Sequence, residues 1–303
     1  MAHRALVSIA LALVLAAPAA ADELPRRRQL PAQDIHFLSP HGTIQRGVRC
    51  ATPTPTRAEI AAVEHTLGQY RAIFGEARPG GGGTNIPVAF HVIYRTERDG
   101  TQTGNVPEEQ LDAQIDVMND AFAAAGFSFT KAVVNRVANN SWFGSCYGAE
   151  RNIKRALAID PAHTLNFYLC APKGGILGFA YLPQSFPEDS FMHGVVVLYS
   201  TLPGGSAAPY NEGDTGTHEV GHYLGLLHTF DGGCNEPGDL VADTPAEASP
   251  ASGCPTGRDT CPSAGLDPIT NFMDYTDDPC MFEFSGGQDT RMQDIVAIYK
   301  PSL

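Results

Sequence analysis

The chain has 303 residues, of which 43% are hydrophobic and 17% are charged, and its formal net charge is −13 at pH 7. These values are typical of one globular domain with additional processing segments. The acidic balance argues against nucleic acid or an anionic membrane as a partner, because both are bound through clustered Lys and Arg side chains.

The first 21 residues have the features of a secretory signal. A short basic start precedes an apolar run over residues 5–17, and alanines at 19–21 supply a small-residue cleavage site. This run is shorter than the roughly 20 residues that a membrane-spanning helix needs, and no later run reaches that length. We therefore expect a secreted, extracellular protein that has no membrane partner.

Residues 22–78 have the features of a propeptide. They contain one amphipathic stretch with apolar residues at helical spacing over 60–70, and they end before Pro79 and a glycine run at 80–83. A glycine run is flexible and accessible to proteases. We therefore expect the mature protein to comprise residues 79–303.

Seven cysteines in an exported chain leave one unpaired when the others form disulfides. Cys50, in the predicted propeptide, is the candidate for the odd thiol. Because a thiolate is a strong zinc ligand, we expect Cys50 to bind zinc in a latent form of the protein. The alternative is a bystander cysteine in a disposable segment. The other six cysteines allow many connectivities, and the sequence alone does not choose among them.

Periodicity predicts alternating strands and helices along the mature part. Alternating apolar and polar residues favour strands, and apolar residues three or four apart favour helices. Strands are predicted over residues 86–96, 127–137, 165–170, 179–182 and 194–200, and helices over 107–126, 150–158, 215–227 and 288–299. This order indicates an α/β fold whose region after residue 228 is rich in Gly, Pro and Asp.

The helix near residue 218 carries a pattern of metal ligands. His218 and His222 are four residues apart, so they share one helix face and can coordinate the same Zn²⁺ ion, with Glu219 beside it. Gly225 can adopt a positive φ that lets the chain leave the helix and bring His228 back as a third ligand. Three protein ligands leave a fourth position open, as in a catalytic zinc site.

Further segments connect this motif to a known family. The pattern HExxHxxGxxH at 218–228 is followed by NFMDY at 271–275, where Met273 matches the methionine of a Met-turn. Between them lie HTFDGGC, GDLVADTP, GCP and DTCP. Together these segments resemble the pappalysins, the branch of the metzincin zinc endopeptidases that is similar to pregnancy-associated plasma protein-A, in its secreted microbial form.

The resemblance implies a metzincin catalytic domain over residues 79–303. A twisted, mainly parallel sheet with backing helices would form the upper subdomain, residues 79–228, which includes the zinc helix. An irregular lower subdomain, residues 229–303, would lie below the cleft. The implied disulfides are Cys234–Cys261, Cys254–Cys280 and, with these two assigned, Cys146–Cys170.

The resemblance also implies a structural calcium site near Asp239, Asp243 and Thr244, whose oxygens suit a hard cation. A solvated acidic loop is the alternative for these residues. The strand near residues 178–183 is a candidate edge to which an extended peptide substrate could add.

Peptide hydrolysis is the chemistry that the predicted zinc site favours. Zinc lowers the pKa of a bound water, and Glu219 would accept the proton as the water attacks a peptide carbonyl and then deliver it to the leaving amine. The resemblance assigns Tyr275 to stabilising the oxyanion, with a packed core tyrosine as the alternative. We expect protein or peptide substrates and a monomeric enzyme.

Two other functions stay open at this point. One is a zinc amidohydrolase that acts on a non-protein amide, and the other is a secreted binding module without catalysis. The presence of Glu219 argues against the second.

Overall fold

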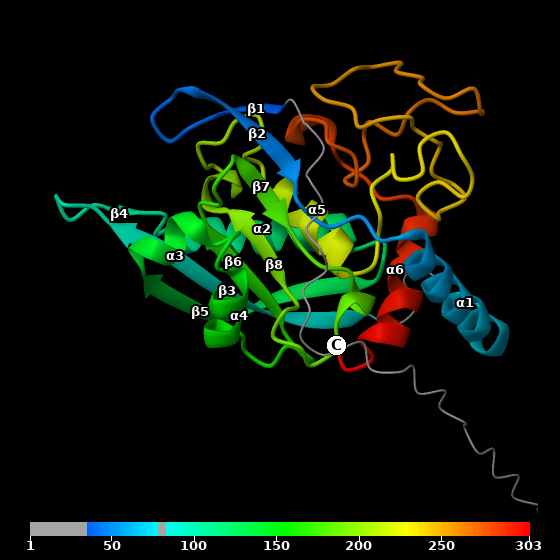
Figure 1. The fold of residues 1–303 in the computed structure, drawn as a ribbon, viewed down its shortest axis with the longest axis horizontal. Coiled ribbons are helices and arrows are strands. Elements are labelled where there is room, and N and C mark those ends of the chain that lie inside the picture. The colour runs from blue at the N-terminus through cyan, green and yellow to red at the C-terminus, as the bar shows by residue number, and fades with distance from the viewer. Residues whose placement is uncertain (1–34, 78–82) are drawn as a thin grey trace, which may run out of the picture.

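The computed structural model describes residues 35–77 and 83–303 (Figure 1). The predicted signal sequence and the beginning of the predicted propeptide lie outside the described residues, as does the first part of the glycine-rich junction. Figure 1 shows the strands at the centre of the molecule and the irregular loops of the lower region gathered at one end.

The strands are β1 (Ile35–Leu38), β2 (Ile44–Cys50), β3 (Thr84–Thr96), β4 (Gln102–Thr103), β5 (Phe127–Ala138), β6 (Leu165–Cys170), β7 (Ile176–Phe179) and β8 (Val195–Leu198). The helices are α1 (Arg57–Phe74), α2 (Glu108–Phe122), α3 (Asn140–Ser145), α4 (Glu150–Leu157), α5 (Asp214–Tyr223) and α6 (Gly286–Tyr299).

The strands form one mixed sheet in the order β1-β2-β7-β8-β6-β3-β4, with β5 also paired to β3. The pairs β2–β7, β3–β5, β3–β6 and β6–β8 are parallel. The pairs β1–β2, β3–β4 and β7–β8 are antiparallel. The prediction of an α/β fold with a mainly parallel sheet is confirmed.

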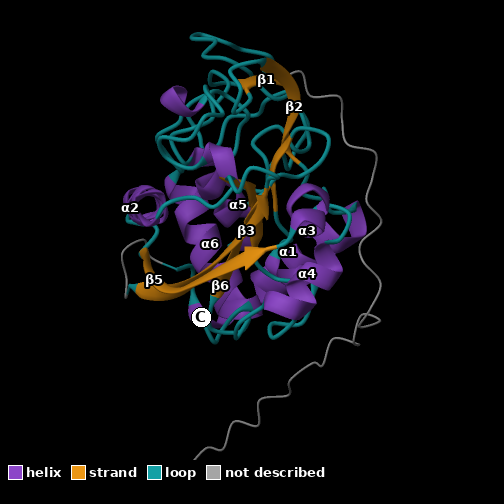
Figure 2. Ribbon diagram, turned by 90° about the vertical axis from the view of Figure 1, so that its left-hand side faces the viewer, coloured by secondary structure: helices purple, strands orange, loops and turns teal. Residues whose placement is uncertain are grey.

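Side-chain alternation along the strands builds a core on each face of the sheet. In β6, Leu165 and Phe167 pack in the core that contains residues of α2 and α5, whereas Tyr168 packs in the core that contains residues of α3 and α4. Figure 2 shows the sheet between these two groups of helices. Because successive residues of a strand point to opposite faces, a strand that is buried on both sides is continuously apolar.

Several predicted elements differ from the structure in their bounds, and two of these lie at the site. The strand predicted over 179–182 shares only Phe179 with the observed strand β7, because pairing with β8 and not apolar content decides where the strand lies. The helix predicted over 215–227 ends at Tyr223, since Gly225 has a φ of 108° and turns the chain out of the helix. The β1–β2 hairpin, β4 and α3 were not predicted.

Residues 35–77, here called the N-terminal segment, contain the β1–β2 hairpin and α1. Val63 and Leu67 of α1 pack with Ile295 of α6, and Figure 1 shows the two helices side by side. Arg71 of α1 also forms an ion pair with Asp294 of α6, with 2.7 Å between Nε and Oδ2. The amphipathic stretch predicted near residues 60–70 is therefore a helix that covers α6.

Disulfides hold the region between α5 and α6, which contains only one short 3₁₀ helix. The structure has Cys234–Cys261 and Cys254–Cys280 in this region and Cys146–Cys170 beside the sheet, which are the pairs that the family resemblance implies. Loops that bury little apolar surface gain stability from such cross-links, which restrict the unfolded chain.

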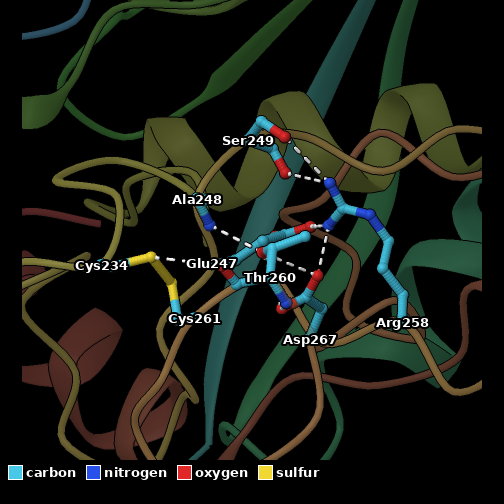
Figure 3. The surroundings of a disulfide bond; sticks show 8 residues. All are labelled: Cys234, Glu247, Ala248, Ser249, Arg258, Thr260, Cys261 and Asp267. Carbon is cyan, nitrogen blue, oxygen red and sulfur yellow. Dashed lines mark hydrogen bonds and ion pairs between the residues drawn. A yellow bond between two sulfur atoms is a disulfide. The ribbon is translucent and has the colours of Figure 1, made fainter.

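A buried charge network lies next to Cys234–Cys261 (Figure 3). The Arg258 guanidinium forms ion pairs with Glu247 and Asp267, whose side chains are fully buried. Burial raises the pKa of Glu247 to about 8, and the nearby Asp274 carboxyl acts in the same direction. The Arg258 guanidinium is therefore the shared cationic partner of two buried carboxyls, those of Glu247 and Asp267.

Candidate active site

Four side chains that can bind a metal converge where α5 meets the end of β2. His218 and His222 belong to α5, His228 follows the turn after it, and Cys50 is the last residue of β2. Their ligand atoms all lie within 4.8 Å of one another, and all four residues are buried. Nitrogen and sulfur donors gathered in this way match the ligand preference of Zn²⁺.

Hydrogen bonds at Nδ1 orient the imidazole rings. His218 Nδ1 donates to the Phe272 carbonyl at 2.7 Å, and His222 Nδ1 donates to the Leu226 carbonyl at 2.8 Å. His228 Nδ1 lies 3.3 Å from a carboxylate oxygen of Asp231. Each ring therefore keeps its proton on Nδ1 and presents the Nε2 lone pair to the centre of the cluster.

The inward nitrogens fit a cation. His222 Nε2 and His228 Nε2 are 3.0 Å apart, and His218 Nε2 has no hydrogen-bond partner among the described residues. Facing lone pairs repel each other unless a positive ion lies between them. Burial lowers the pKa of His222 to about 3 and lowers that of His218 well below its usual value, so both rings are held neutral, as metal ligands must be.

Two close approaches hold the helix against the C-terminal region. The Met273 sulfur lies so close to Gly221 that an added Cβ there would be 2.5 Å from it. At Gly225 an added Cβ would be 2.5 Å from the Ile295 side chain. Met273 is therefore an apolar floor beneath the histidines, which suits a thioether better than binding zinc does.

Glu219 lies fully buried next to the ligand cluster. Its Oε2 accepts a hydrogen bond from Thr52 Oγ1 at 3.0 Å and lies 3.5 Å from Cys50 Sγ. An added Cβ at Gly178 of β7 would be 2.7 Å from Oε1, so the carboxylate rests against the strand. Burial raises the pKa of Glu219 to about 8. A general base of this kind works best when its pKa is near the working pH.

Tyr275 reaches the same cluster from the Met-turn. Its hydroxyl lies 3.0 Å from His228 Nε2, and the residue is only 3% exposed. The Phe230 ring stacks on His228, with ring centroids 4.8 Å apart. The Tyr275 hydroxyl thus stands beside the metal ligands, where it can donate a hydrogen bond.

β2 covers the edge of the sheet at the site. It pairs in parallel with β7, with Val48 opposite Ile176 and Cys50 opposite Gly178. The Ala51 amide donates to the Gly178 carbonyl at 2.9 Å. The N-terminal segment therefore occupies the strand edge to which a peptide could otherwise add.

Arg49 fills a buried pocket beside the cluster, and sequence reasoning missed it. Its guanidinium lies 3.2 Å from Asp278, and both side chains are fully buried. It also donates to Thr215 Oγ1 and lies over the Tyr210 ring, 4.9 Å from the centroid. The available signal was an arginine directly before the candidate zinc-binding cysteine.

Two carboxyls face this guanidinium. Burial and the neighbouring Asp278 raise the pKa of Asp214 to about 8, and Arg49 opposes the shift. Burial raises the pKa of Asp278 to about 6, again against the effect of Arg49. The pocket is therefore acidic without Arg49, and desolvation makes an unpaired charge there costly.

The residues expected near calcium lie apart from the histidines. Asp239 is 4% exposed, and neither its Oδ2 nor Thr244 Oγ1 has a hydrogen-bond partner of standard geometry among the described residues. Asp243 instead accepts hydrogen bonds from Ser285 Oγ and the Gly287 amide at the beginning of α6. Asp239 and Thr244 contact each other, since the Thr244 hydroxyl opposes the burial that raises the pKa of Asp239; apart from this contact, these two of the three side chains have an oxygen available for a cation.

Comparisons with known proteins agree with this geometry. Residues 150–297 match the family model described as pregnancy-associated plasma protein-A. An extracellular metalloprotease of Sordaria macrospora is 43% identical over 80% of this chain and 86% of its own length. Extracellular metalloprotease 1 of Coccidioides posadasii is 46% identical over 68% of this chain and 75% of its own.

Solved structures of similar fold are metallopeptidases as well. A point mutant of Tannerella forsythia promirolysin aligns with a TM-score of 0.69 at 26% identity, over 80% of this chain and 89% of that one. Mature mirolysin from Tannerella forsythia in complex with a cleaved peptide aligns with a TM-score of 0.63 at 29% identity, over 70% and 91%. Among the described helices of this chain, none has the length and apolar character to cross a membrane.

Proposed function

This chain belongs to the pappalysins, the metalloprotease family of pregnancy-associated plasma protein-A, and is a zinc-dependent metalloendopeptidase; we propose that it is secreted as a latent zymogen that its N-terminal segment blocks. Residues 1–21 would be the signal, 22–78 the propeptide and 79–303 the mature enzyme. Membership of a protease family removes the alternative of a binding module without catalysis. The convergence of Cys50, Glu219 and the three histidines carries the proposal.

His218, His222 and His228 would hold one zinc ion. The lowered pKa values of the buried His218 and His222 rings and the facing Nε2 atoms of His222 and His228 support this assignment. When bound, zinc would supply a Lewis acid that polarises the scissile carbonyl and lowers the pKa of water.

Glu219 would act as general base and then as general acid. It would accept a proton from the attacking water and pass it to the leaving amine. A cation held by the histidines would lower the pKa of this buried carboxyl from about 8 and so favour the ionised base.

Tyr275 would donate a hydrogen bond to the oxyanion that develops on the substrate carbonyl. The placement of its hydroxyl 3.0 Å from a zinc-ligating nitrogen supports this role. Such a donor strengthens its interaction as charge forms on the substrate, which is the condition for lowering the barrier.

Cys50 would keep the zymogen latent by binding the metal. Its sulfur lies within the ligand cluster, and β2 covers the edge of β7. After removal of the propeptide, the ligand position and the strand edge would both become accessible to a substrate peptide.

The Arg49 pocket supports a preference for basic substrate side chains. Asp278, Thr215 and Tyr210 surround a guanidinium in the zymogen, and they would remain with the mature enzyme. We expect Arg or Lys to be enriched on one side of the cut bond in a peptide-library digest. Asp278→Asn should reduce that enrichment at least tenfold, because a buried guanidinium needs an anionic partner.

A structural calcium ion is a further part of the proposal. The available oxygens of Asp239 and Thr244 support it, whereas Asp243 would have to exchange its hydrogen bonds with α6 for the ion. We expect proteins or peptides as substrates, no nucleic acid or membrane partner, and a monomer.

The decisive experiment compares the secreted protein with Glu219→Gln. The variant should keep one zinc per chain and lose about 10²- to 10⁴-fold in peptide cleavage, the usual contribution of a general base. Cleavage of casein by the parent enzyme, abolished by a zinc chelator and restored by zinc, would exclude an amidohydrolase that acts only on non-protein amides. Parental turnover by Glu219→Gln would refute the role given to this residue.

A further inference from the structure

Thr52 lies two residues after Cys50 and is buried between α5 and the end of β7. Its hydroxyl donates to Glu219 Oε2 at 3.0 Å. The same oxygen accepts a hydrogen bond from the Ala180 amide at 2.9 Å. The residue is 9% exposed. Thr52 therefore links the proposed catalytic base to the backbone just beyond β7.

A threonine hydroxyl can make both contacts at once. It has one O–H donor and two acceptor lone pairs, so it can donate to the carboxylate while it accepts from the amide. Its neighbour Cys50 contacts the same Glu219 oxygen at 3.5 Å, and the Thr52 amide donates to Cys50 Sγ at 3.3 Å. Cys50 thus lies within the histidine cluster and also contacts the base, whereas Thr52 engages the base and the Ala180 amide.

Both groups that Thr52 engages are needed in the active enzyme. When the Glu219 carboxylate accepts the hydrogen bond from Thr52, one lone pair of Oε2 is occupied, and the hydroxyl takes a position beside that oxygen that a water could otherwise take. The Ala180 amide follows directly after β7, at the edge to which an extended peptide could add. Its N–H group is the only backbone donor of Ala180, and it is already bound to the Thr52 hydroxyl.

We propose that Thr52 is a second latency residue, which holds Glu219 and the Ala180 amide in an inactive arrangement in addition to the metal binding proposed for Cys50. This inference rests on the proposed role of Glu219 as the base. It predicts that a zymogen without the Cys50 thiol remains partly latent, and that the remaining latency depends on the Thr52 hydroxyl.

The first test uses full-length zymogens and a short quenched-fluorescent peptide. Initial hydrolysis is measured before gels detect loss of the N-terminal segment, for Cys50→Ser and for the double variant Cys50→Ser/Thr52→Val. Valine keeps the shape of threonine and removes the hydroxyl. We expect the double variant to be about 10- to 100-fold faster, which corresponds to one hydrogen bond to a charged acceptor.

The second test does not depend on activity. In a Glu219→Gln background the chain stays uncut, and hydrogen exchange at the Ala180 amide reports the Thr52 contact. Thr52→Val should accelerate this exchange about tenfold or more, whereas Cys50→Ser should leave it slow. Zinc content should be unchanged by Thr52→Val.

Thr54→Val is the matched control, because Thr54 is an exposed threonine two residues further on. It should change neither the initial rate nor the exchange. All zymogens should give mature enzymes of equal kcat/KM after the segment is removed. An unchanged initial rate in the double variant, or unchanged exchange at Ala180 in Thr52→Val, would overturn the inference. Cleavage at the parental rate by Glu219→Gln would instead refute the proposed function.

Discussion

Arg49→Ala should release the N-terminal segment from the active site. The substitution removes one partner of a fully buried ion pair and leaves the Asp278 carboxyl without its counter-charge. Breaking such a pair costs about 3–5 kcal/mol. Because about 1.4 kcal/mol corresponds to a factor of ten, docking of the segment should weaken by about 10²- to 10⁴-fold. The lost contacts with Thr215 and the Tyr210 ring act in the same direction.

The assay for Arg49→Ala is a time course of activation of the secreted full-length protein. Peptide hydrolysis and the appearance of the shortened chain are followed together, and both should begin much earlier than in the parent. Arg57→Ala is the control, since Arg57 is an exposed arginine at the beginning of α1. Arg49→Lys keeps the charge without the planar fork and should fall between the two. Equal lag times for Arg49→Ala and the parent would refute the reasoning.

Three further predictions concern the mature enzyme and its stability. Tyr275→Phe should bind zinc normally and lose about 10²- to 10³-fold in kcat, and an unchanged kcat would remove Tyr275 from the mechanism. Gly178→Ala should lower kcat about tenfold or more with little change in KM, because the new Cβ would be 2.7 Å from the Glu219 carboxylate; a pure rise in KM would contradict this. Glu247→Gln should flatten the pH dependence of unfolding: the folded pKa of about 8 exceeds the ordinary 4.5, so the parent loses stability as pH rises between those values. The slope for this one proton is about 1.4 kcal/mol per pH unit, and denaturant midpoints at pH 5 and pH 8 that fall in parallel for both proteins would argue against it.

Much of the fold and the candidate zinc ligands follow from local sequence. Spacing of four residues puts His218 and His222 on one helix face in any context that forms the helix, and Gly225 permits the turn that returns His228. The strand over 165–170 was predicted at its observed bounds because five of its six residues are apolar or aromatic, and its one polar residue, Asn166, does not interrupt the pattern. Such features depend on interactions between residues close in the chain, so periodicity and residue type are sufficient to predict them.

Only the tertiary structure decided which distant groups meet. Residues 176–182 are apolar throughout, so the end of β7 at Phe179 depends on its pairing with β8. Arg49 meets Asp278 across 229 positions, and Thr52 meets Glu219 across 167. No local pattern encodes these contacts, because they depend on the order of strands in the sheet and on β2 adding to its edge. The sequence by itself determined the candidate metal ligands, and the assembled sheet determined which residues of the N-terminal segment contact them.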